Sequence, residues 1–469
     1  MTNPNRERPK PEISNASHLA KRRMSSQMES SSTHMKKRRL FLKSEPVTRN
    51  PRPNRSLHTS NQFKAFRSSS RGRRKKMARK SNNEVSSRRW VFSSEDHFNN
   101  KDKIVVVSYN ILGVENALKH PDLYSNIPHR FLEWDRRKLL IREEVYNYNA
   151  GIICFQEVDR FDNLDNLLQN DGFKGVYKAR TGEAYDGCAV FWKDKLFTLL
   201  HEEDIEFQQF GLRNNVAQLC IFEVNHDTLE SDVCSPTALT PFTRNRRFLV
   251  GNIHVLFNPN RGDIKLGQVR LFVDKAYKLS QEWDNIPVIL AGDLNSVPQS
   301  AIYEFLASSK LDIQLYNRRN MSGQLEASSS CRVFRPEVGY EASISMSVRR
   351  QLGYRWSKEE LGLATGAAGV THLRSHLKLQ SAYAGVPGNN KTRDDTGEPL
   401  ATSYHSKFMG TVDYIWHTKE FVPVRVLETL PIDILRRTKG LPSEKWGSDH
   451  LALVCEFAFA SNEDRSQFA

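Results

Sequence analysis

Short apolar runs that end in polar residues recur along the chain. The clearest of these segments spans Val288 to Ala291. Gly292 closes it, and Asp293 and Asn295 follow, two residues apart. Such a run is typical of a strand buried on both faces, and side chains two residues apart in extended backbone share a face. The pattern predicts a strand whose end presents a carboxylate beside a carboxamide. In the alternative interpretation, Asp293 and Asn295 only form the turn.

Similar apolar runs predict further strands at residues 104–110, 152–157, 187–192, 216–222, 248–254, 408–416 and 448–454. Apolar residues at helical spacing predict helices over residues 131–149, 161–168, 267–282 and 300–306. Because some strands are joined by helices and others by loops, we expect an α/β fold in which two packed mixed β-sheets are flanked by helices. This four-layer domain should cover residues 101–462.

The first hundred residues have a different composition from the rest of the chain. They hold 25 lysines and arginines against 7 acidic residues, whereas the other 369 residues hold 44 basic and 47 acidic groups. Few aliphatic residues and a high net charge predict a disordered basic tail over residues 1–100. The basic clusters at 36–39 and 71–76 are of the nuclear-import or RNA-binding type. A transit peptide and a merely solvated linker are the alternatives.

A second unusual stretch, residues 324–395, is rich in Ser and Gly and lacks strong periodicity. We expect an insertion or a mobile lid there, with a short helix after the capping-box sequence Ser357–Glu360.

Cysteine use and hydropathy restrict the compartment in which we expect the protein. The six cysteines include no C-x-x-C pair, which favours a reducing compartment over a disulfide framework or a zinc site. No apolar stretch is long enough to cross a membrane, and the N-terminus lacks the apolar core of a secretion signal. We therefore expect no membrane association, and a location in the nucleus and the cytoplasm.

The polar residues at the predicted strand ends form the candidate site. They are Asn110, Glu157, His254, Asp293, Asn295, Asp413, Asp449 and His450. Ligand sites of α/β sheets lie at strand ends, and an oxygen-rich set without cysteine suits Mg²⁺ or Mn²⁺.

These residue types fit the hydrolysis of a phosphodiester. A carboxylate such as Glu157 can bind the cation, Asp293 can orient or deprotonate a water molecule, and Asn110 with Asn295 can hold water and phosphate. The histidines can donate hydrogen bonds to a phosphate oxygen, with Asp413 fixing the tautomer of one of them. Taken singly, Glu157 could form a strand-end salt bridge and His254 could be a buried core histidine.

Six separated motifs together resemble the endonuclease/exonuclease/phosphatase superfamily, which has the deoxyribonuclease-I-like fold. They are Ser108–Asn110, Gln156–Glu157, Asn252–His254, Gly292–Asn295, Thr411–Ile415 and Ser448–His450. Within it, the turn at Asn258–Pro259, the sequence Ile264–Leu266, the segment Leu377–Tyr383, the pair Glu398–Pro399 and Phe408 resemble the carbon catabolite repressor 4 (deadenylase) branch.

The resemblance implies a Mg²⁺-dependent 3′-to-5′ exoribonuclease that shortens poly(A) tails. Glu157 and Asp449 are then the expected metal ligands, and Asp293, Asn295, Asp413, His450, His254 and Asn110 the catalytic set. Phe408 and Pro259 would hold an adenine between them, although Phe408 could instead be a core residue.

Three alternatives stay open at this point. The same fold could act as a phosphatase, as a phosphodiesterase on a substrate other than poly(A), or as a non-catalytic RNA-binding adaptor. Yeast and animal members that join the large deadenylase assembly carry leucine-rich repeats before the catalytic domain, and residues 1–100 contain none. Any contact with such an assembly would therefore pass through an adaptor, or through RNA bound by the basic tail.

Overall fold

Two β-sheets face each other at the centre of the domain, and each carries one pair of parallel strands. The computed structural model describes residues 88–94, 103–225, 246–324 and 356–460. The predicted disordered tail lies almost wholly outside these residues, as do the loop 226–245, Cys234 and Cys331. The four cysteines that are described are free and buried. No helix in these ranges is long and apolar enough to cross a bilayer.

The first sheet has seven strands in the order β1-β16-β17-β2-β3-β5-β4. Their bounds are β1 Trp90–Phe92, β16 Phe421–Leu427, β17 Leu453–Phe459, β2 Lys103–Asn110, β3 Ile152–Gln156, β5 Gly187–Lys193 and β4 Phe173–Ala179. Only β2 and β3 run parallel, with Asn110 beside Gln156 at their carboxyl ends. Residues 90–92 fall within the expected tail, yet they form β1, the edge strand that pairs with β16.

The second sheet has six strands in the order β12-β15-β9-β8-β7-β6. Their bounds are β12 Gln380–Ser381, β15 Asp413–His417, β9 Val288–Asp293, β8 Arg247–His254, β7 Val216–Val224 and β6 Phe197–Glu206. Here β8 and β9 form the parallel pair, with His254 beside Asp293. Antiparallel β15 starts at the same edge, where Asp413 pairs with Asp293.

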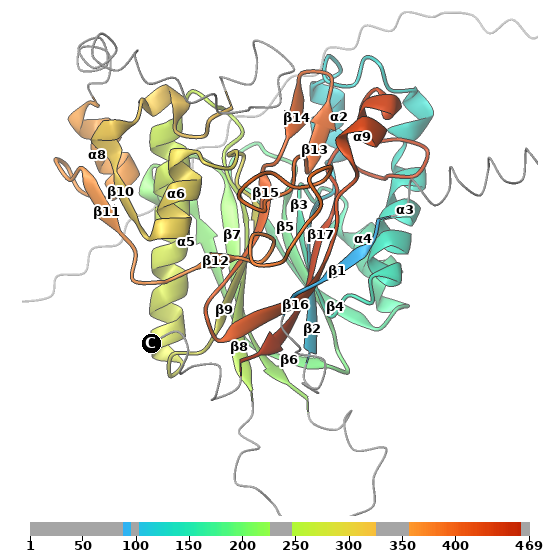
Figure 1. Cartoon of the computed structure of the whole chain (residues 1–469), viewed down its shortest axis with the longest axis horizontal. Coiled ribbons are helices and arrows are strands. Elements are labelled where there is room, and N and C mark those ends of the chain that lie inside the picture. Colours follow the sequence, from blue (N-terminus) through green and yellow to red (C-terminus); the bar gives the residue numbers. More distant parts are fainter. Residues whose placement is uncertain (1–87, 95–102, 226–245, 325–355, 461–469) are drawn as a thin grey trace, which may run out of the picture. The chain divides into compact units, whose positions relative to one another are not determined.

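Helices cover the outer face of each sheet, which gives the four expected layers (Figure 1). On the first sheet lie α3, Trp134–Asn147, and α4, Phe161–Gln169. On the second lie α5, Gly262–Glu282, and α6, Ala301–Ser308. The helix α5 begins five residues before the predicted start at Gly267. The expected fold class is confirmed.

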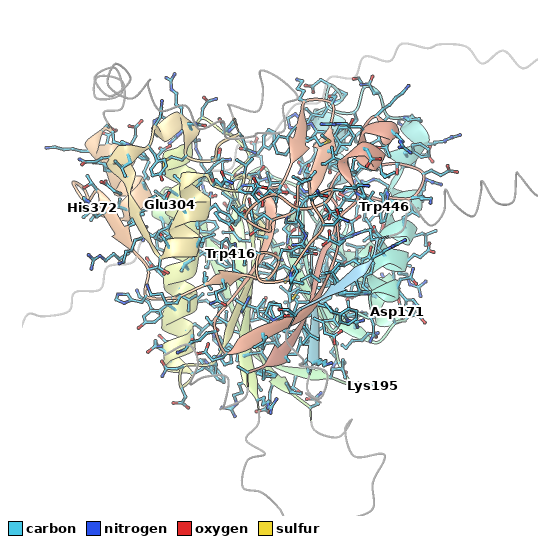
Figure 2. The ribbon with its side chains drawn as sticks, viewed as in Figure 1. Asp171, Lys195, Glu304, His372, Trp416 and Trp446 are labelled. Carbon is cyan, nitrogen blue, oxygen red and sulfur yellow. The ribbon has the colours of Figure 1, made fainter. Side chains whose placement is uncertain are left out.

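Three apolar clusters hold the layers together. One fills the space between the sheets and includes Val106, Phe248 and Ile415, and the other two lie under the outer helices. Each large apolar side chain that becomes fully buried contributes roughly 1.5–3 kcal/mol. Trp416 lies inside the domain, whereas the polar side chains of Lys195, Glu304 and His372 are exposed at its periphery (Figure 2). The three clusters therefore form an apolar interior, and polar side chains gather at the sheet edge that carries the strand ends.

The remaining elements are short. They are α2 Val114–Lys119, β10 Lys310–Asp312, α8 Lys358–Thr365, β11 His372–Arg374, β13 Ser403–His405, β14 Phe408–Gly410 and α9 Ile432–Thr438. Helix α8 starts with the predicted capping box between Ser357 and Glu360. Within the expected insertion 324–395, residues 325–355 are outside the described ranges, but Leu373 and Tyr383 are buried in the core clusters.

Two of the predicted strands are wrong in extent. The run 408–416 forms two strands, because β14 pairs with β13 in a separate hairpin and β15 joins the second sheet. Between them, the amides of Val412 and Asp413 bond to the Thr402 hydroxyl, which turns the chain from one sheet to the other. The run 448–454 forms a strand only from Leu453, since the Ser448 hydroxyl accepts from the His450 amide in a tight turn. Strands β4, β6 and β16 were not predicted.

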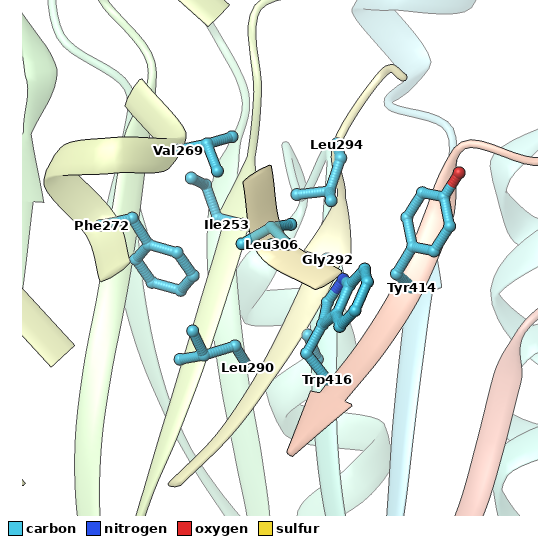
Figure 3. A pocket seen from close by; sticks show the side chains of 10 residues that line it. Ile253, Val269, Phe272, Leu290, Gly292, Leu294, Leu306, Tyr414 and Trp416 are labelled. Atoms are coloured by element: carbon cyan, nitrogen blue, oxygen red, sulfur yellow. The ribbon is translucent and has the colours of Figure 1, made fainter. Parts of the chain in front are cut away.

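The strand β9 presents opposite faces to the two sides of its sheet. On the helix side, a cavity of about 10 Å³ is lined by apolar groups that include Phe272, Leu306 and Trp416 (Figure 3). This cavity is too small for a substrate. Asp293 points to the other side because side chains alternate along a strand. The polar chemistry therefore lies between the two sheets at their shared edge.

Candidate active site

The Asn110 side chain joins the two sheets at the edge where the parallel strands end. Its Nδ2 atom lies 3.1 Å from Glu157 Oε1 and 3.1 Å from Asp293 Oδ2. One amide group thus donates to a carboxylate of each sheet. Its Oδ1 atom accepts from the Leu112 amide at 3.0 Å, and its carbonyl accepts from the Ser448 hydroxyl at 2.7 Å. These contacts fix the orientation of the Asn110 amide.

Glu157 follows β3 directly and adopts a positive φ of 58°, which is uncommon for a residue with a side chain. Its Oε2 atom accepts from the Gly113 amide at 3.0 Å and from Asn116 Nδ2 at 2.9 Å. Burial alone would raise the pKa of Glu157. However, the nearby His254 and the hydrogen bonds from Asn116 and Asn110 hold this pKa below its usual value. Glu157 is therefore ionised, as a metal ligand must be.

Asp413 and His450 form a buried pair beside Asp293. His450 Nδ1 lies 2.8 Å from Asp413 Oδ2, and its Nε2 atom lies 3.9 Å from Asp293 Oδ2. Although burial opposes a charged imidazole, Asp413 and Asp449 raise the pKa of His450 well above its ordinary value. The ring is then an imidazolium that can donate from Nε2.

His254 and Asn295 lie on the other side of Asp293. Asn295 Nδ2 lies 3.2 Å from His254 Nε2 and 3.0 Å from the Val255 carbonyl oxygen, and His254 Nε2 lies 3.5 Å from Asp293 Oδ2. The Asn295 backbone amide donates to Asp293 Oδ1 at 2.7 Å. Burial and the neighbouring Asp413 raise the pKa of Asp293 above its usual range.

The residues present fit a divalent cation. Asp293, Asp413 and His450 each offer a ligand atom, and these atoms lie within 4.8 Å of one another. Asp413 Oδ1 is buried and has no hydrogen-bond partner among the described residues. An unsatisfied buried carboxylate oxygen beside another carboxylate is costly unless a cation or a proton compensates it. With Glu157 nearby, the donor set is of the hard, oxygen-rich kind.

Three further residues were predicted for the site. Asp449 Oδ2 accepts from the Tyr124 hydroxyl at 2.9 Å, and burial with the charges of Asp449 and Glu157 raises the pKa of that tyrosine. Phe408 is half-buried on β14, with its ring centre 6.0 Å from that of His405. Pro259 is half-buried in the turn between β8 and α5. The roles predicted for Asp449, Phe408 and Pro259 stay predictions.

Sequence reasoning missed several residues that hold the site in place. Asn252 Nδ2 donates to the carbonyls of Phe155 and Ala189 at 3.0 Å each, and its Oδ1 accepts from Gln156 Nε2 at 2.8 Å. These bonds tie the sheets together beneath the site. A signal existed, since Asn252 lies two residues before His254 on a strand and therefore shares its face.

Lys265 on α5 also supports the site and was not predicted to do so. Its side chain is fully buried and donates to the Asn295 carbonyl at 2.6 Å and to Gln324 Oε1 at 2.7 Å. Burial lowers the pKa of Lys265 to about 7. The contact holds Asn295 in its positive-φ conformation, φ 47°. No periodicity reveals that contact in the sequence.

Comparisons with known proteins identify the family of the chain. The endonuclease/exonuclease/phosphatase family model matches residues 107–450. Carbon catabolite repressor protein 4 homolog 5 of Arabidopsis thaliana is 62% identical over 375 residues, covering 80% of this chain and 81% of the relative. Homolog 3 of the same plant is 47% identical over 359 residues, covering 76% and 75%.

A solved structure extends the comparison. ANGEL2, described as a 2′,3′-cyclic phosphatase in complex with adenosine-2′,3′-vanadate, superposes with a TM-score of 0.61 at 28% identity and covers 80% of this chain and 99% of its own. The family and branch predicted from the motifs are confirmed. The chain belongs to the endonuclease/exonuclease/phosphatase family of phosphodiester hydrolases, in its carbon catabolite repressor 4 branch.

Proposed function

We propose that the protein is a divalent-cation-dependent exoribonuclease that removes adenosines one at a time from the 3′ end of RNA. The observation that carries this proposal is the Asn110 amide held between Glu157 and Asp293, beside the His450–Asp413 pair. A proton acceptor, a cation ligand and an imidazolium donor thus surround one point. Metal-assisted hydrolysis of a phosphodiester needs these three groups together.

Asp293 acts on the attacking water. The Asn295 backbone amide and Asn110 Nδ2 fix its two oxygens, and its raised pKa makes it a better proton acceptor than an ordinary aspartate. The water oxygen bonds to phosphorus while the bond from phosphorus to the 3′ oxygen of the preceding nucleotide breaks. The leaving 3′ oxygen takes up one proton, so one water is consumed. The products are 5′-AMP and an RNA shorter by one nucleotide.

His450 stabilises the charge that develops on the phosphate. As an imidazolium, it donates from Nε2 to a non-bridging oxygen, and Asp413 holds the proton on Nδ1. Asn295 and His254 line the opposite side of Asp293 and can bind another phosphate oxygen.

Glu157, together with oxygens of Asp293 and Asp413, would hold the cation, which we propose to be Mg²⁺ or Mn²⁺. When bound, it neutralises charge on the phosphate and the leaving oxygen. Binding can be measured separately from activity. Mg²⁺ should raise the melting temperature of the wild-type protein and leave that of a Glu157→Gln variant unchanged.

Two observations support adenosine and RNA as the substrate. The close relatives are of the carbon catabolite repressor 4 type, and the ANGEL2 structure holds an adenosine derivative. Phe408 offers a half-buried ring near His405, and the backbone amide of the adjacent Tyr404 donates to the Asp449 carbonyl at 2.9 Å. An adenine stacked on Phe408 would therefore lie close to the catalytic pair. Poly(A) RNA is the proposed substrate, and recruitment through an adaptor is the proposed route to other proteins.

A second candidate function is hydrolysis of a terminal 2′,3′-cyclic phosphate. The similarity to ANGEL2, at 28% identity over 80% of this chain, favours it. Both reactions use water on an adenosine phosphodiester, so the same residues serve either one.

One assay separates the candidates. Purified protein with Mg²⁺ is given 3′-hydroxyl RNAs that end in twenty A, C, G or U residues, and in parallel an RNA that ends in a 2′,3′-cyclic phosphate. We expect release of 5′-AMP from the A-tailed RNA, faster than release from the other tails, and no release by Glu157→Gln. Opening of the cyclic phosphate without nucleotide release would favour the second candidate. RNA binding without either reaction would make the protein an adaptor.

A further inference from the structure

Exposed aromatic and basic side chains continue outward from the candidate site along three neighbouring loops. We call this group the aromatic ledge and define it as Lys119, His120, Tyr185 and Phe257. The rings of His120 and Phe257 lie 6.4 Å apart, and Lys119 Nζ lies 4.5 Å from the ring centre of Tyr185. Since Lys119 and His120 are consecutive, the four side chains form one continuous line.

The ledge is exposed although two of its four members are large aromatic residues. Tyr185 is 62% exposed and Phe257 is 55% exposed. Large rings of this kind are usually buried in a core or covered by a ligand. The basic neighbours Lys119 and His120 are also exposed, and no ion pair with an acidic group is formed by Lys119 among the residues that the structure describes.

Three members of the ledge are close in the chain to residues of the site, and Tyr185 contacts one of them, Lys119. Lys119 and His120 end helix α2, whose Asn116 donates to Glu157, and the His120 amide bonds to the Asn116 carbonyl one turn away. One helical turn advances about 5.4 Å. Phe257 comes three residues after His254, a span of at most roughly 11 Å. The ledge therefore adjoins Asn116 and His254 along the chain.

The loop after α2 also connects the ledge to the hairpin that carries Phe408. The Ser406 hydroxyl donates to the Asp122 carbonyl at 2.9 Å, and Lys407 forms an ion pair with Asp122. The hairpin strands β13 and β14 and helix α2 accordingly lie side by side (Figure 1). A terminal base stacked on Phe408 would leave the preceding nucleotides directed along this loop.

We propose that the aromatic ledge binds the nucleotides just upstream of the terminal adenosine in single-stranded RNA. This inference rests on the proposed function and specifies how the substrate is held. Every base has a π-face, so rings such as Phe257 and Tyr185 can stack bases of any sequence. Lys119 and His120 supply charge that complements the phosphates between those bases. The ledge thus selects a single strand with at least three nucleotides, whereas the Phe408 region would select the terminal base.

The test compares substrate length in the full-length protein. Rates of 5′-AMP release are measured on a diadenylate and on a 20-nucleotide poly(A), for Phe257→Ala, Tyr185→Ala and Lys119→Gln. On the long substrate, we expect KM to rise about tenfold for each loss of a ring. On the diadenylate, KM and kcat should stay at wild-type values. For Lys119→Gln, the slope of log affinity against log salt should fall by about 0.7.

Tyr146→Ala is the matched control. Tyr146 is 65% exposed but lies near the end of α3, in the segment that leads into the start of β3, at the opposite sheet edge. The basic tail is present in every variant, so its affinity for RNA cancels in the comparison. The proposal is overturned if the ledge variants match the Tyr146→Ala variant on the long substrate, or if they lose activity equally on both lengths.

Failure of the proposed function would look different. If the wild-type protein releases no nucleotide from any RNA, binding of the same 20-nucleotide RNA is measured by fluorescence anisotropy. Weaker binding by Phe257→Ala and Tyr185→Ala, with Tyr146→Ala unchanged, would uphold the ledge without the exonuclease. Equal binding by all three would reject the ledge.

Discussion

Replacing Asp413 by Asn tests the catalytic pair directly. Asp413 Oδ2 lies 2.8 Å from His450 Nδ1, and the two groups are buried. The change keeps the shape of the side chain but removes its charge. A hydrogen bond to a charged partner is worth roughly 1.5–3 kcal/mol. If that stabilisation acts in the transition state, kcat should fall by about 10- to 150-fold.

The pH dependence gives a sharper result than the loss of rate. Asp413 raises the pKa of His450, so without its charge the alkaline limb of the kcat profile should move to lower pH. Asp413 also raises the pKa of Asp293, so the acid limb should move in the same direction. Both limbs of the profile are therefore expected to shift towards acid.

The assay is release of 5′-AMP from A-tailed RNA between pH 5 and pH 10. Asp171→Asn serves as the control, because it breaks the Arg142 ion pair, with atoms 2.7 Å apart, on the outside of the domain. It should leave the profile unchanged. The reasoning is refuted if Asp413→Asn keeps both limbs in place. Full recovery of its kcat at high Mg²⁺ concentration would show that Asp413 acts only by holding the cation and not through His450.

Three other changes have defined expected outcomes. Phe408→Ala should remove the preference for A over C, G and U tails while kcat on A changes less than tenfold, and an unchanged preference would return Phe408 to a core role. Gly292→Ala should lower the unfolding free energy by several kcal/mol in urea titrations, because the new Cβ would lie 2.0 Å from the Ile253 carbonyl oxygen at a backbone φ of 152°. Gly362 has open space around it, so Gly362→Ala should change the unfolding free energy by about 1 kcal/mol or less. For Glu144, burial raises the pKa to about 7. The folded protein thus keeps a proton that the unfolded chain loses near pH 4.5, and stability should fall as pH rises through this interval, by about 1.4 kcal/mol per unit of pKa difference. Glu144→Gln should flatten that dependence, and equal slopes for both proteins would contradict the stated protonation.

The sequence predicted the layers and most of the site because both depend on strongly patterned strands. Runs such as 104–110 and 288–291 are apolar enough to define buried strands, and parallel pairing then brings their polar ends together. The strands β4 and β6 were missed because their positions are only partly buried and carry many polar residues. Strand β16 is mostly buried and apolar, but Pro423 interrupts its pattern.

Contacts between residues that are far apart in the sequence could not be predicted from the sequence pattern. Asn116 donates to Glu157 only because the turn after β2 folds back over β3, and Lys265 reaches Asn295 through the packing of α5 against the loop after β9. Neither residue differs in pattern from an ordinary surface amide or lysine. The break between β14 and β15 likewise depends on the Thr402 hydroxyl, which lies outside the predicted run 408–416.

Strand β1 has a consequence for any shortened version of the protein. Arg88 just before it donates to the carbonyls of Ala452 and Glu428, and the strand covers the outer side of β16. A chain that starts at Lys103 would bare a row of unpaired amides and carbonyls, which invites strand-to-strand aggregation between molecules. Expression of the catalytic region alone should therefore begin before Arg88.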